Sequence, residues 1–510
     1  MKIPGIAISL LLLLSNSSAV VAQIPAVSGN ICVVDLGANI DAIANRAEFS
    51  RSRWGILIQP LSSPTTLYSR DAQKYFIPAS NVKLLTTAAA LQKLGADFRI
   101  KTSVYSGENG NLHIVGRGDP SIAEAQLKSL AQQLKQRGIS RVNELIGDDS
   151  YFQGNAVNPN WEWEDAQAGY GAPINSLIFN QNAIELILSP QAIGQPLKVT
   201  FAEPKLTNQW QIENKSVTVG QNESEFVEVG RDFAQSILRV GGQLKAGAES
   251  ESAYVAVVNP ANNFLQHFQQ ALVAEGIVVK QALVASTADC RFMNYSPDPT
   301  LPVGTRHCRV PTEKPYSSRN FTQELATIES PTLAELVKET NRESNNVYAE
   351  VLLRLLGKVT GKMSVSEEDT SELGLKELKT TLTQLGVNPN SYILADGSGL
   401  SRHNLISPEA LVQTLRLMAN SPAASFYRTS LPVAGKSGTL KNRFITPNRI
   451  ILQAKTGTLT GVAALSGYVE VPNYEPLVFS IMVNQSDLSA PKVRSAIDEI
   501  MLLLNRLSRC

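Results

Sequence analysis

The sequence of 510 residues carries almost no net charge, because its 46 lysines and arginines are balanced by 45 aspartates and glutamates. Binding to nucleic acids or to anionic membranes depends on an excess of basic side chains, so neither is expected. After the N-terminal segment, no stretch reaches the ~18 apolar residues that suggest a membrane-spanning helix. The composition fits a globular protein of about three domains, or one large domain with insertions.

Several motifs of metal, phosphate and histidine chemistry are also missing. Neither Cys-x-x-Cys nor His-Glu-x-x-His occurs, so no zinc site is expected, and no other metal or cofactor. The run Gly435-Lys436-Ser437 suggests a phosphate-binding loop, but position 430 is serine where that loop requires glycine. A Ser-His-Asp hydrolase is poorly supported, because the chain has four histidines and no Gly-x-Ser-x-Gly.

Residues 1–22 are predicted to form a secretory signal peptide. A single lysine precedes an apolar run from Ile6 to Leu14, and small residues follow it, so cleavage is expected before Gln23. No leucine-rich lipobox precedes Cys32, which argues against a lipid anchor. We therefore expect an exported protein, periplasmic or extracellular, that is soluble or loosely associated with a membrane.

The four cysteines form an even set, which in an exported chain predicts two disulfides. Cys290 and Cys308 flank a polar loop with prolines and are expected to pair with each other. Cys32 and Cys510 would then join the two ends of the chain. The sequence alone allows three pairings, and four free thiols remain the alternative.

The first candidate for chemistry lies at the start of an apolar helix. Apolar residues at steps of three and four, closed by Gly95, predict that this helix is buried. Ser80 and Lys83 lie three residues apart at its start and therefore share one face. An amine beside a hydroxyl can take its proton, which suggests a serine acyl-transfer enzyme with a lysine base. The same pattern recurs at Ser489 and Lys492, where an N-terminal helix cap explains it, so the first pair needs partners.

The remaining pattern predicts a mixed α and β chain. Between residues 116 and 323 no nucleophile–base motif occurs, and we interpret this part as inserted. The expected strands are 54–60, 66–68, 99–105, 112–115, 449–454, 462–471 and 477–484, and the expected helices are 123–136, 262–275, a pair beginning at Ser330-Pro331 and ending near Gly357, and 493–504.

Two further motifs complete an ordered trio: Ser80-x-x-Lys83, Ser344-x-Asn346 and Lys455-Thr456-Gly457. Each is weak alone, since Ser-x-Asn also occurs at residues 28–30 and the polar cluster at 342–346 could simply be an exposed turn. Lys436-Ser437-Gly438 competes for the third place, but only Lys455 lies between two good strands. Penicillin-binding proteins and class A β-lactamases carry such a trio.

The sequence resembles the D-Ala-D-Ala carboxypeptidase/endopeptidase family, the low-molecular-mass class C penicillin-binding proteins of the penicillin-binding protein 4 type, over nearly the whole mature chain. Beside the trio, the resemblance is carried by Gly118-Asp119-Pro120-Ser121, Tyr170-Gly171-Ala172-Pro173, Asp396-Gly397-Ser398-Gly399-Leu400-Ser401-Arg402, Gly438-Thr439-Leu440 and Leu459-Thr460-Gly461-Val462. The family tolerates Ser-Asn-Asn as its central motif. The long separation of Ser80 from Ser344 is typical of the family, which nests extra domains there.

The resemblance implies an α+β fold. A β-lactamase/transpeptidase-like domain, with an antiparallel sheet flanked by helices and a helical subdomain, would carry a large nested insertion rich in β-strands. Residues 23–118 and 325–510 would form this discontinuous serine acyl-transferase domain. Residues 119–324 would be the inserted region, as two nested domains.

The resemblance also implies a role for each residue of the trio. Ser80 would attack the carbonyl between two D-alanines, and Lys83 would take the serine's proton once burial or a nearby positive charge has lowered its pKa. Lys455 would supply that charge and hold the terminal carboxylate of the substrate. Ser344 would relay a proton to the leaving amine, and Asn346 would orient Lys83 or the substrate amide.

Substrate contacts are implied in the same way. The backbone N–H groups of Ser80 and Thr458 would form the oxyanion hole, and the motif Thr456-Gly457-Thr458 would line the substrate, with the two threonine hydroxyls near its carboxylate. An arginine fork suits a carboxylate, so Arg402 would bind the one on the diamino acid of a peptidoglycan stem peptide. Asp165 and Tyr170 would bind its ammonium end. The alternative for all three is a structural role in loops.

The expected partners are peptidoglycan peptides and β-lactam antibiotics, which would remain on the serine as a long-lived ester. A β-lactamase would share the trio but not the long insert. A non-catalytic cell-wall-binding or scaffold protein is an alternative of a different class, and the intact motifs count against it.

Overall fold

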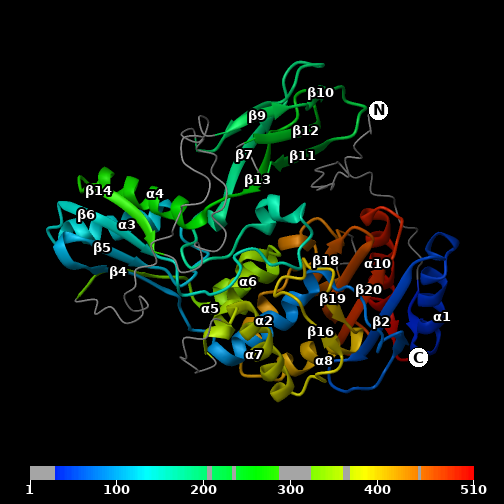
Figure 1. Cartoon of the computed structure of the whole chain (residues 1–510). Coiled ribbons are helices and arrows are strands. Elements are labelled where there is room, and N and C mark those ends of the chain that lie inside the picture. The colour runs from blue at the N-terminus through cyan, green and yellow to red at the C-terminus, as the bar shows by residue number, and fades with distance from the viewer. Residues whose placement is uncertain (1–28, 204–209, 233–236, 286–322, 360–367, 446–449) are drawn as a thin grey trace, which may run out of the picture. The chain divides into compact units, whose positions relative to one another are not determined.

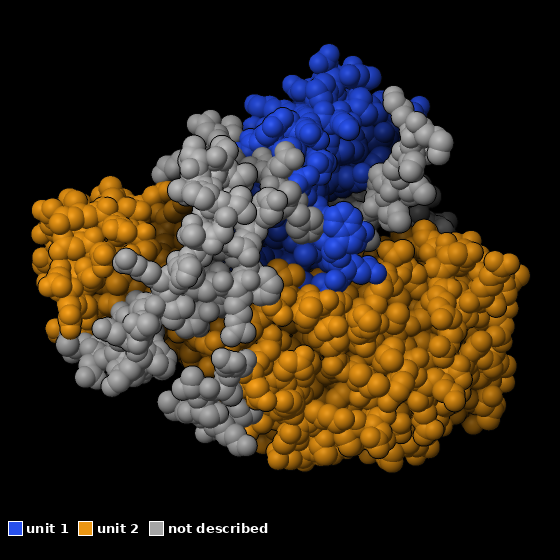
Figure 2. Space-filling model, viewed as in Figure 1, with its two compact units in different colours: residues 1–28, 161–173, 179–260 blue, residues 29–160, 174–178, 261–510 orange. Residues whose placement is uncertain are grey.

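A computed structural model describes residues 29–203, 210–232, 237–285, 323–359, 368–445 and 450–510 (Figure 1). These residues form two compact units (Figure 2). The smaller unit comprises residues 161–173 and 179–260, and the larger comprises the others. The predicted signal peptide and the predicted Cys290–Cys308 pair lie outside the described residues. The domain boundaries expected at residues 118 and 324 stay a prediction.

The larger unit contains a five-stranded antiparallel sheet with the order β18-β19-β20-β2-β3. Its strands are β2 (Arg53–Pro60), β3 (Tyr68–Arg70), β18 (Ile451–Leu459), β19 (Val462–Glu470) and β20 (Leu477–Asn484). Helices α1 (Val33–Ala44) and α10 (Ala490–Leu504) pack their apolar residues against one face, and α8 (Pro408–Ala419) packs against the other (Figure 1). Because both faces are covered, every residue of β20 is buried.

Helix α2 (Val82–Leu94) is the central helix of the larger unit, and residues 82–91 are all buried. A single 3₁₀ turn, η2 (Ala79–Asn81), leads into it. The helices around it are α5 (Leu333–Arg342), α6 (Asn346–Val359), α7 (Thr370–Leu385), α8 and α9 (Ala424–Thr429). The prediction of a buried helix beginning at Ser80–Lys83 is confirmed.

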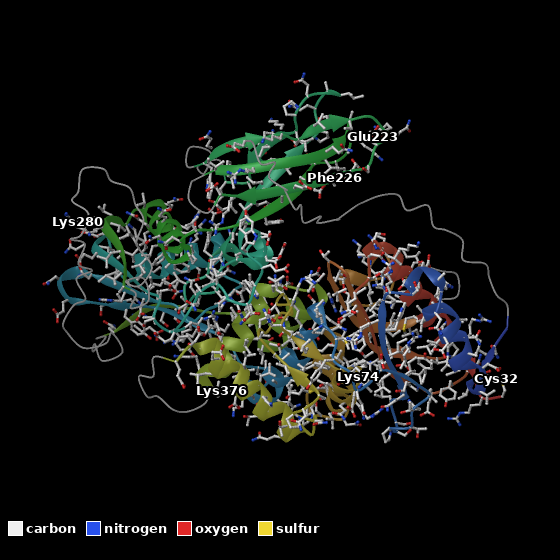
Figure 3. All side chains as sticks on the ribbon, turned by 45° about the vertical axis from the view of Figure 1, so that its right-hand side comes forward. Cys32, Lys74, Glu223, Phe226, Lys280 and Lys376 are labelled. Atoms are coloured by element: carbon white, nitrogen blue, oxygen red, sulfur yellow. A yellow bond between two sulfur atoms is a disulfide. The ribbon has the colours of Figure 1, made fainter. Side chains whose placement is uncertain are left out.

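A second five-stranded sheet of the larger unit has the order β14-β6-β5-β4-β15. Its strands are β4 (Lys101–Ser106), β5 (Leu112–Val115), β6 (Arg141–Asp148), β14 (Val278–Ala285) and β15 (Glu324–Glu329). The pairs β5–β6 and β6–β14 are parallel, and α3 (Glu124–Gln136) connects β5 to β6. Lys280 lies on β14, which is an edge strand of this sheet (Figure 3). Helix α4 (Pro260–Ala274) precedes that strand in the chain.

The smaller unit is built from two sheets packed on each other. One has the order β13-β7-β8, and in the other β12 pairs with β9, β10 and β11. The strands are β7 (Ala183–Ser189), β8 (Lys198–Phe201), β9 (Gln211–Asn214), β10 (Val217–Val219), β11 (Phe226–Arg231), β12 (Ile237–Lys245) and β13 (Glu251–Ala256). Leu186, Leu238 and Val255 belong to their common core. Glu223 and Phe226 lie where the chain enters β11 (Figure 3).

The two ends of the larger unit are joined covalently. Cys32 is bonded to Cys510, with their Cα atoms 5.3 Å apart across 478 positions of sequence, and Cys32 lies directly before α1 (Figure 3). The short strands β1 (Ile31–Cys32) and β21 (Leu507–Ser508) pair in parallel beside the bond. The predicted pairing of these two cysteines is confirmed.

One predicted helix start is wrong. The sequence placed it at Ser330, but α5 begins at Leu333 with Thr332 as its N-cap, and Glu335 completes a capping box. Ser330 is instead buried, and its hydroxyl accepts a hydrogen bond from the backbone N–H of Ile100 at 2.9 Å. A serine before a proline is common at a helix N-cap but is equally compatible with the segment before the helix. The glutamate three residues after Thr332 is the signal that identifies Thr332 as the N-cap.

The other short elements are β16 (Tyr392–Ile393) and β17 (Leu405–Ile406), which pair with each other. They frame the loop that carries the Asp396-Gly397-Ser398-Gly399 stretch. No helix within the described ranges combines the length and the apolar character that crossing a bilayer requires.

Candidate active site

Ser80 lies in the turn η2, directly before the central helix. The turn is anchored to the sheet, because the Asn81 amide donates to Ser466 Oγ at 2.8 Å and the Ile77 N–H donates to Asn484 Oδ1 at 2.7 Å. Ala79, the residue before the serine, has a positive φ of 49°. The anchored turn holds the serine hydroxyl at the start of α2 in one orientation.

Lys83 is fully buried beside this hydroxyl. Its Nζ donates to Ser80 Oγ at 3.0 Å, to Asn346 Oδ1 at 2.6 Å and to the Ser398 carbonyl oxygen at 2.6 Å. A lysine ammonium has three donors and no acceptor, so these three contacts satisfy it completely. The predicted neighbours Ser80 and Asn346 therefore both contact the predicted base.

Burial sets the protonation of this lysine. The loss of solvation lowers the pKa of Lys83 from 10.5 to about 7, although the carboxyl groups of Asp396 and Glu350 act in the opposite direction. At neutral pH a large fraction of the amine is then unprotonated, which a proton acceptor requires.

The second lysine of the trio is paired with its serine. Lys455, on β18, is fully buried, and its Nζ donates to Ser344 Oγ at 2.8 Å and to the Thr456 carbonyl oxygen at 3.0 Å. Burial, and secondarily the nearby Lys83, hold the pKa of Lys455 well below its ordinary value. Ser344 lies between α5 and α6 with a φ of 61°, a left-handed conformation that is uncommon for a residue with a side chain.

Two glycines allow other segments to approach the nucleophile closely. A Cβ at Gly457 would lie 2.7 Å from the Pro78 carbonyl oxygen and 3.2 Å from the Ser80 nitrogen, so β18 runs directly against the serine turn. A Cβ at Gly399 would lie 1.9 Å from the Ala79 carbonyl oxygen, and Gly399 also has a φ of 85°. Both positions therefore require glycine.

The remaining residues of the third motif lie along the exposed side of the site. The Thr456 hydroxyl donates to that of Thr439 at 2.7 Å, and Thr458 is exposed. Lys436, the competing lysine, is exposed on the surface. The choice of Lys455 over Lys436 thus agrees with burial and with contact to Ser344.

Arg402 belongs to the same compact unit as Ser80. Both of its terminal nitrogens donate to the Thr460 carbonyl oxygen, each at 3.1 Å, which places the guanidinium at the turn between β18 and β19. Asp165 and Tyr170 belong to the smaller unit, where the Tyr170 hydroxyl donates to Asp165 Oδ1 at 2.9 Å. Burial and the neighbouring carboxylate raise the pKa of Tyr170.

The structure thus brings together Ser80, Lys83, Ser344, Asn346 and Lys455, and their catalytic roles stay predictions. Sequence reasoning missed Glu350 and Asp396 as neighbours of Lys83. A signal for Glu350 was present, because it is the only acidic residue in the largely apolar helix α6 and follows Asn346 by one helical turn.

Comparison with known proteins identifies a family and several relatives that match most of this chain. The model of the D-Ala-D-Ala carboxypeptidase 3 (S13) family matches residues 36–291 and 313–504. The chain is 31% identical over 479 residues to a D-alanyl-D-alanine carboxypeptidase of Actinomadura sp. (strain R39), covering 90% of this chain and 82% of the relative. It is 27% identical over 520 residues to the penicillin-sensitive carboxypeptidase A of Dictyostelium discoideum, covering 92% of each.

Among solved structures, the chain is similar to penicillin binding protein 4 (dacB) from Haemophilus influenzae. The TM-score is 0.70 at 24% sequence identity, and the match covers 91% of this chain and 97% of the other. This likeness concerns the fold, and it confirms the predicted α+β class with helices flanking an antiparallel sheet.

Proposed function

The chain belongs to the D-Ala-D-Ala carboxypeptidase (S13) family and is a serine-type carboxypeptidase or endopeptidase; from this premise we propose that it cuts peptidoglycan stem peptides after a D-alanine, through an acyl-enzyme on Ser80. The single observation that carries the assignment to residues is the contact of the buried Lys83 amine with Ser80 Oγ at 3.0 Å. A nucleophile and a base within hydrogen-bond distance are what covalent catalysis requires.

Acylation begins when the unprotonated amine of Lys83 takes the proton of the Ser80 hydroxyl. The oxygen attacks the carbonyl carbon between the two D-alanines, and the negative charge that develops on the carbonyl oxygen is stabilised by the backbone N–H groups of Ser80 and Thr458. Asn346 holds the Lys83 amine in place, since its amide oxygen accepts a hydrogen bond from Nζ at 2.6 Å.

Collapse of the tetrahedral intermediate breaks the peptide bond and releases the amine. Ser344 gives this amine a proton and recovers one from Lys455, to which it is hydrogen-bonded at 2.8 Å. The proton that Lys83 took from Ser80 then replaces, by way of solvent, the one that Lys455 gave up, so both lysines return to their starting states. A substrate carboxylate beside Lys455 favours its charged form, which opposes the effect of burial on its pKa. In deacylation the free amine of Lys83 takes a proton from a water molecule, whose oxygen attacks the ester carbonyl. Lys83 returns this proton to Ser80 Oγ as the acyl group leaves as a carboxylic acid.

A β-lactam would acylate Ser80 by the same route. Its cleaved amide stays tethered to the acyl group and does not diffuse away, so the ester is long-lived. Arg402 would bind the side-chain carboxylate of the diamino acid in the stem peptide, since its guanidinium belongs to the unit that contains the serine. Binding of the ammonium end by Asp165 and Tyr170 rests on the family resemblance and on their mutual hydrogen bond.

Export to the periplasm or the extracellular space is part of the proposal. The Cys32–Cys510 bond supports it, because disulfides persist in oxidising compartments. N-terminal sequencing of the protein recovered from its native host would begin at Gln23 if residues 1–22 are removed as a signal peptide. A mature protein that begins at Met1 would contradict export by this route.

The test of the activity is mass spectrometry of purified peptidoglycan digested with the enzyme. Loss of terminal D-alanine indicates carboxypeptidase action, and loss of cross-linked dimers indicates endopeptidase action. A Ser80→Ala variant is the control and should leave both unchanged. If the wild-type enzyme changes neither product, or if the variant matches it, the proposal is wrong.

A further inference from the structure

A buried carboxyl group interacts electrostatically with Lys83. Glu350 belongs to α6, four residues after Asn346, and is only 1% exposed. Its Oε1 accepts a hydrogen bond from the Gly397 N–H at 2.9 Å, and the Ser398 hydroxyl also donates to this carboxyl group. Glu350 therefore holds two consecutive residues of the loop that contacts Lys83.

A second buried acidic side chain, that of Asp396, belongs to the same loop and accepts hydrogen bonds from its backbone. Asp396 has no exposed surface, and its oxygens accept from the N–H groups of Gly399 at 2.7 Å and Ser401 at 2.6 Å. The amide of Asn404 donates to it at 2.8 Å. These donors fix the loop in a tight turn.

In this loop the Ser398 carbonyl oxygen accepts from Lys83 Nζ at 2.6 Å. The neighbouring Gly397 carbonyl accepts from the Thr86 hydroxyl on the same helix as Lys83, at 2.7 Å. A Cβ at Gly397 would lie 2.9 Å from the Leu353 side chain, so the loop is also packed tightly on α6. The position of the lysine amine therefore depends on a loop that is held by α6.

We propose that Glu350, together with Asp396, is a positioning residue for Lys83: it fixes the Ser398 carbonyl against the amine and so aims the amine at Ser80. This inference rests on the proposed function, in which Lys83 is the base. It assigns a role to two acidic groups that the steps of acylation do not themselves use.

The charge of Glu350 gives the proposal a second consequence. Burial, and secondarily Asp396, raise the pKa of Glu350 above its ordinary value. The charged groups around the pair are Asp396 from the loop, Arg354 from α6 and Lys455 from β18. An ionised Glu350 favours the protonated lysine, so removal of this charge should let Lys83 lose its proton at a lower pH.

The experiment compares Glu350→Gln and Glu350→Ala with the wild-type enzyme. The readout is the second-order rate constant for labelling by a fluorescent penicillin between pH 5 and 9. The glutamine keeps an oxygen for the Gly397 N–H but cannot ionise, so the midpoint of the acid limb should fall by about half a unit to one unit, with a similar plateau. The alanine removes the anchor, so its plateau should fall about 10–100-fold.

Glu377→Gln is the matched control. Glu377 is also a buried acid, and it pairs with Lys93 on α2 at 2.7 Å, far along the helix from Lys83. Its loss should lower the melting temperature but leave both the midpoint and the plateau at the wild-type values. A purely structural role for Glu350 would give the same pattern as this control.

The proposal is overturned if Glu350→Gln has the midpoint of the wild type, or if a folded Glu350→Ala variant keeps the wild-type plateau. Should the alanine variant not fold, the isosteric glutamine variant decides alone. Failure of the proposed function looks different, because then the wild-type enzyme itself is not labelled or Lys83→Ala is labelled at the wild-type rate.

Discussion

The buried amine of Lys83 predicts how acylation depends on pH. A lysine with its ordinary pKa would be unprotonated in only about one molecule in 3,000 at pH 7. Burial lowers the pKa of Lys83 to about 7, so about half of the molecules carry the free amine at that pH. The environment of the lysine thus raises the supply of base by about a thousandfold.

The assay is the rate constant for covalent labelling by a fluorescent penicillin, measured from pH 5 to pH 9. The lowered pKa belongs to a group that must lose a proton to act, so the rate should be low in acid and rise through about pH 7. Below the midpoint it should increase about tenfold per pH unit, and above it the rate should level off.

A Lys83→Arg variant tests whether the free amine of Lys83 is required. Its guanidinium keeps the positive charge but remains protonated throughout this range, so labelling should fall by about a thousandfold or more. A midpoint above pH 9, a flat profile, or an arginine variant with the wild-type rate would refute the reasoning that burial makes Lys83 the base.

Three further predictions concern the surroundings of the site. Gly457→Ala places a Cβ 2.7 Å from the Pro78 carbonyl oxygen, directly before the serine turn, so labelling should fall about 10–100-fold. Gly220→Ala is the control and should match the wild type, because a Cβ there would meet no atom within 4 Å beyond its neighbours in the chain. Replacing Cys32 and Cys510 together by serine should lower the free energy of unfolding in urea by about 2–5 kcal/mol, and a labelling rate that fell in parallel would show that the disulfide also shapes the site. Arg402→Ala should raise KM for a stem peptide whose diamino acid has a free side-chain carboxylate while penicillin labelling stays constant, and an equal KM for the amidated and free peptides in the wild type would contradict this role.

The elements that carry the site could be predicted from the sequence because their patterns are local. The helix after Ser80 has apolar residues at helical spacing, and the predicted strand Leu477–Asn484 has the same bounds as β20. The helix predicted at 123–136 differs from α3 by one residue. The predicted start of α5 was wrong because Ser330-Pro331 has the pattern of a helix N-cap. Its serine instead accepts a hydrogen bond from Ile100, a contact between distant segments that a local pattern cannot reveal.

The assembly of the site depended on the resemblance, because spacing alone does not bring three segments together. The ordered motifs predicted one site drawn from three distant segments, and in the structure Lys83 contacts Asn346 and Lys455 contacts Ser344. Nothing local indicated that a backbone carbonyl, that of Ser398, would be the third contact of Lys83. Glu350 left a local signal, since it is the only acid on the largely apolar helix α6. The loop that it contacts, however, lies 47 residues further along the chain.

The central claim is that Ser80 is the nucleophile, and mass spectrometry of the penicillin-treated protein tests it most directly. The intact mass should rise by one penicillin, and after proteolysis the adduct should lie on the peptide that contains Ser80. The adduct should be lost in Ser80→Ala and nearly lost in Lys83→Arg. An adduct on Ser344 or another residue, or an unmodified wild-type protein that is folded, would contradict the account.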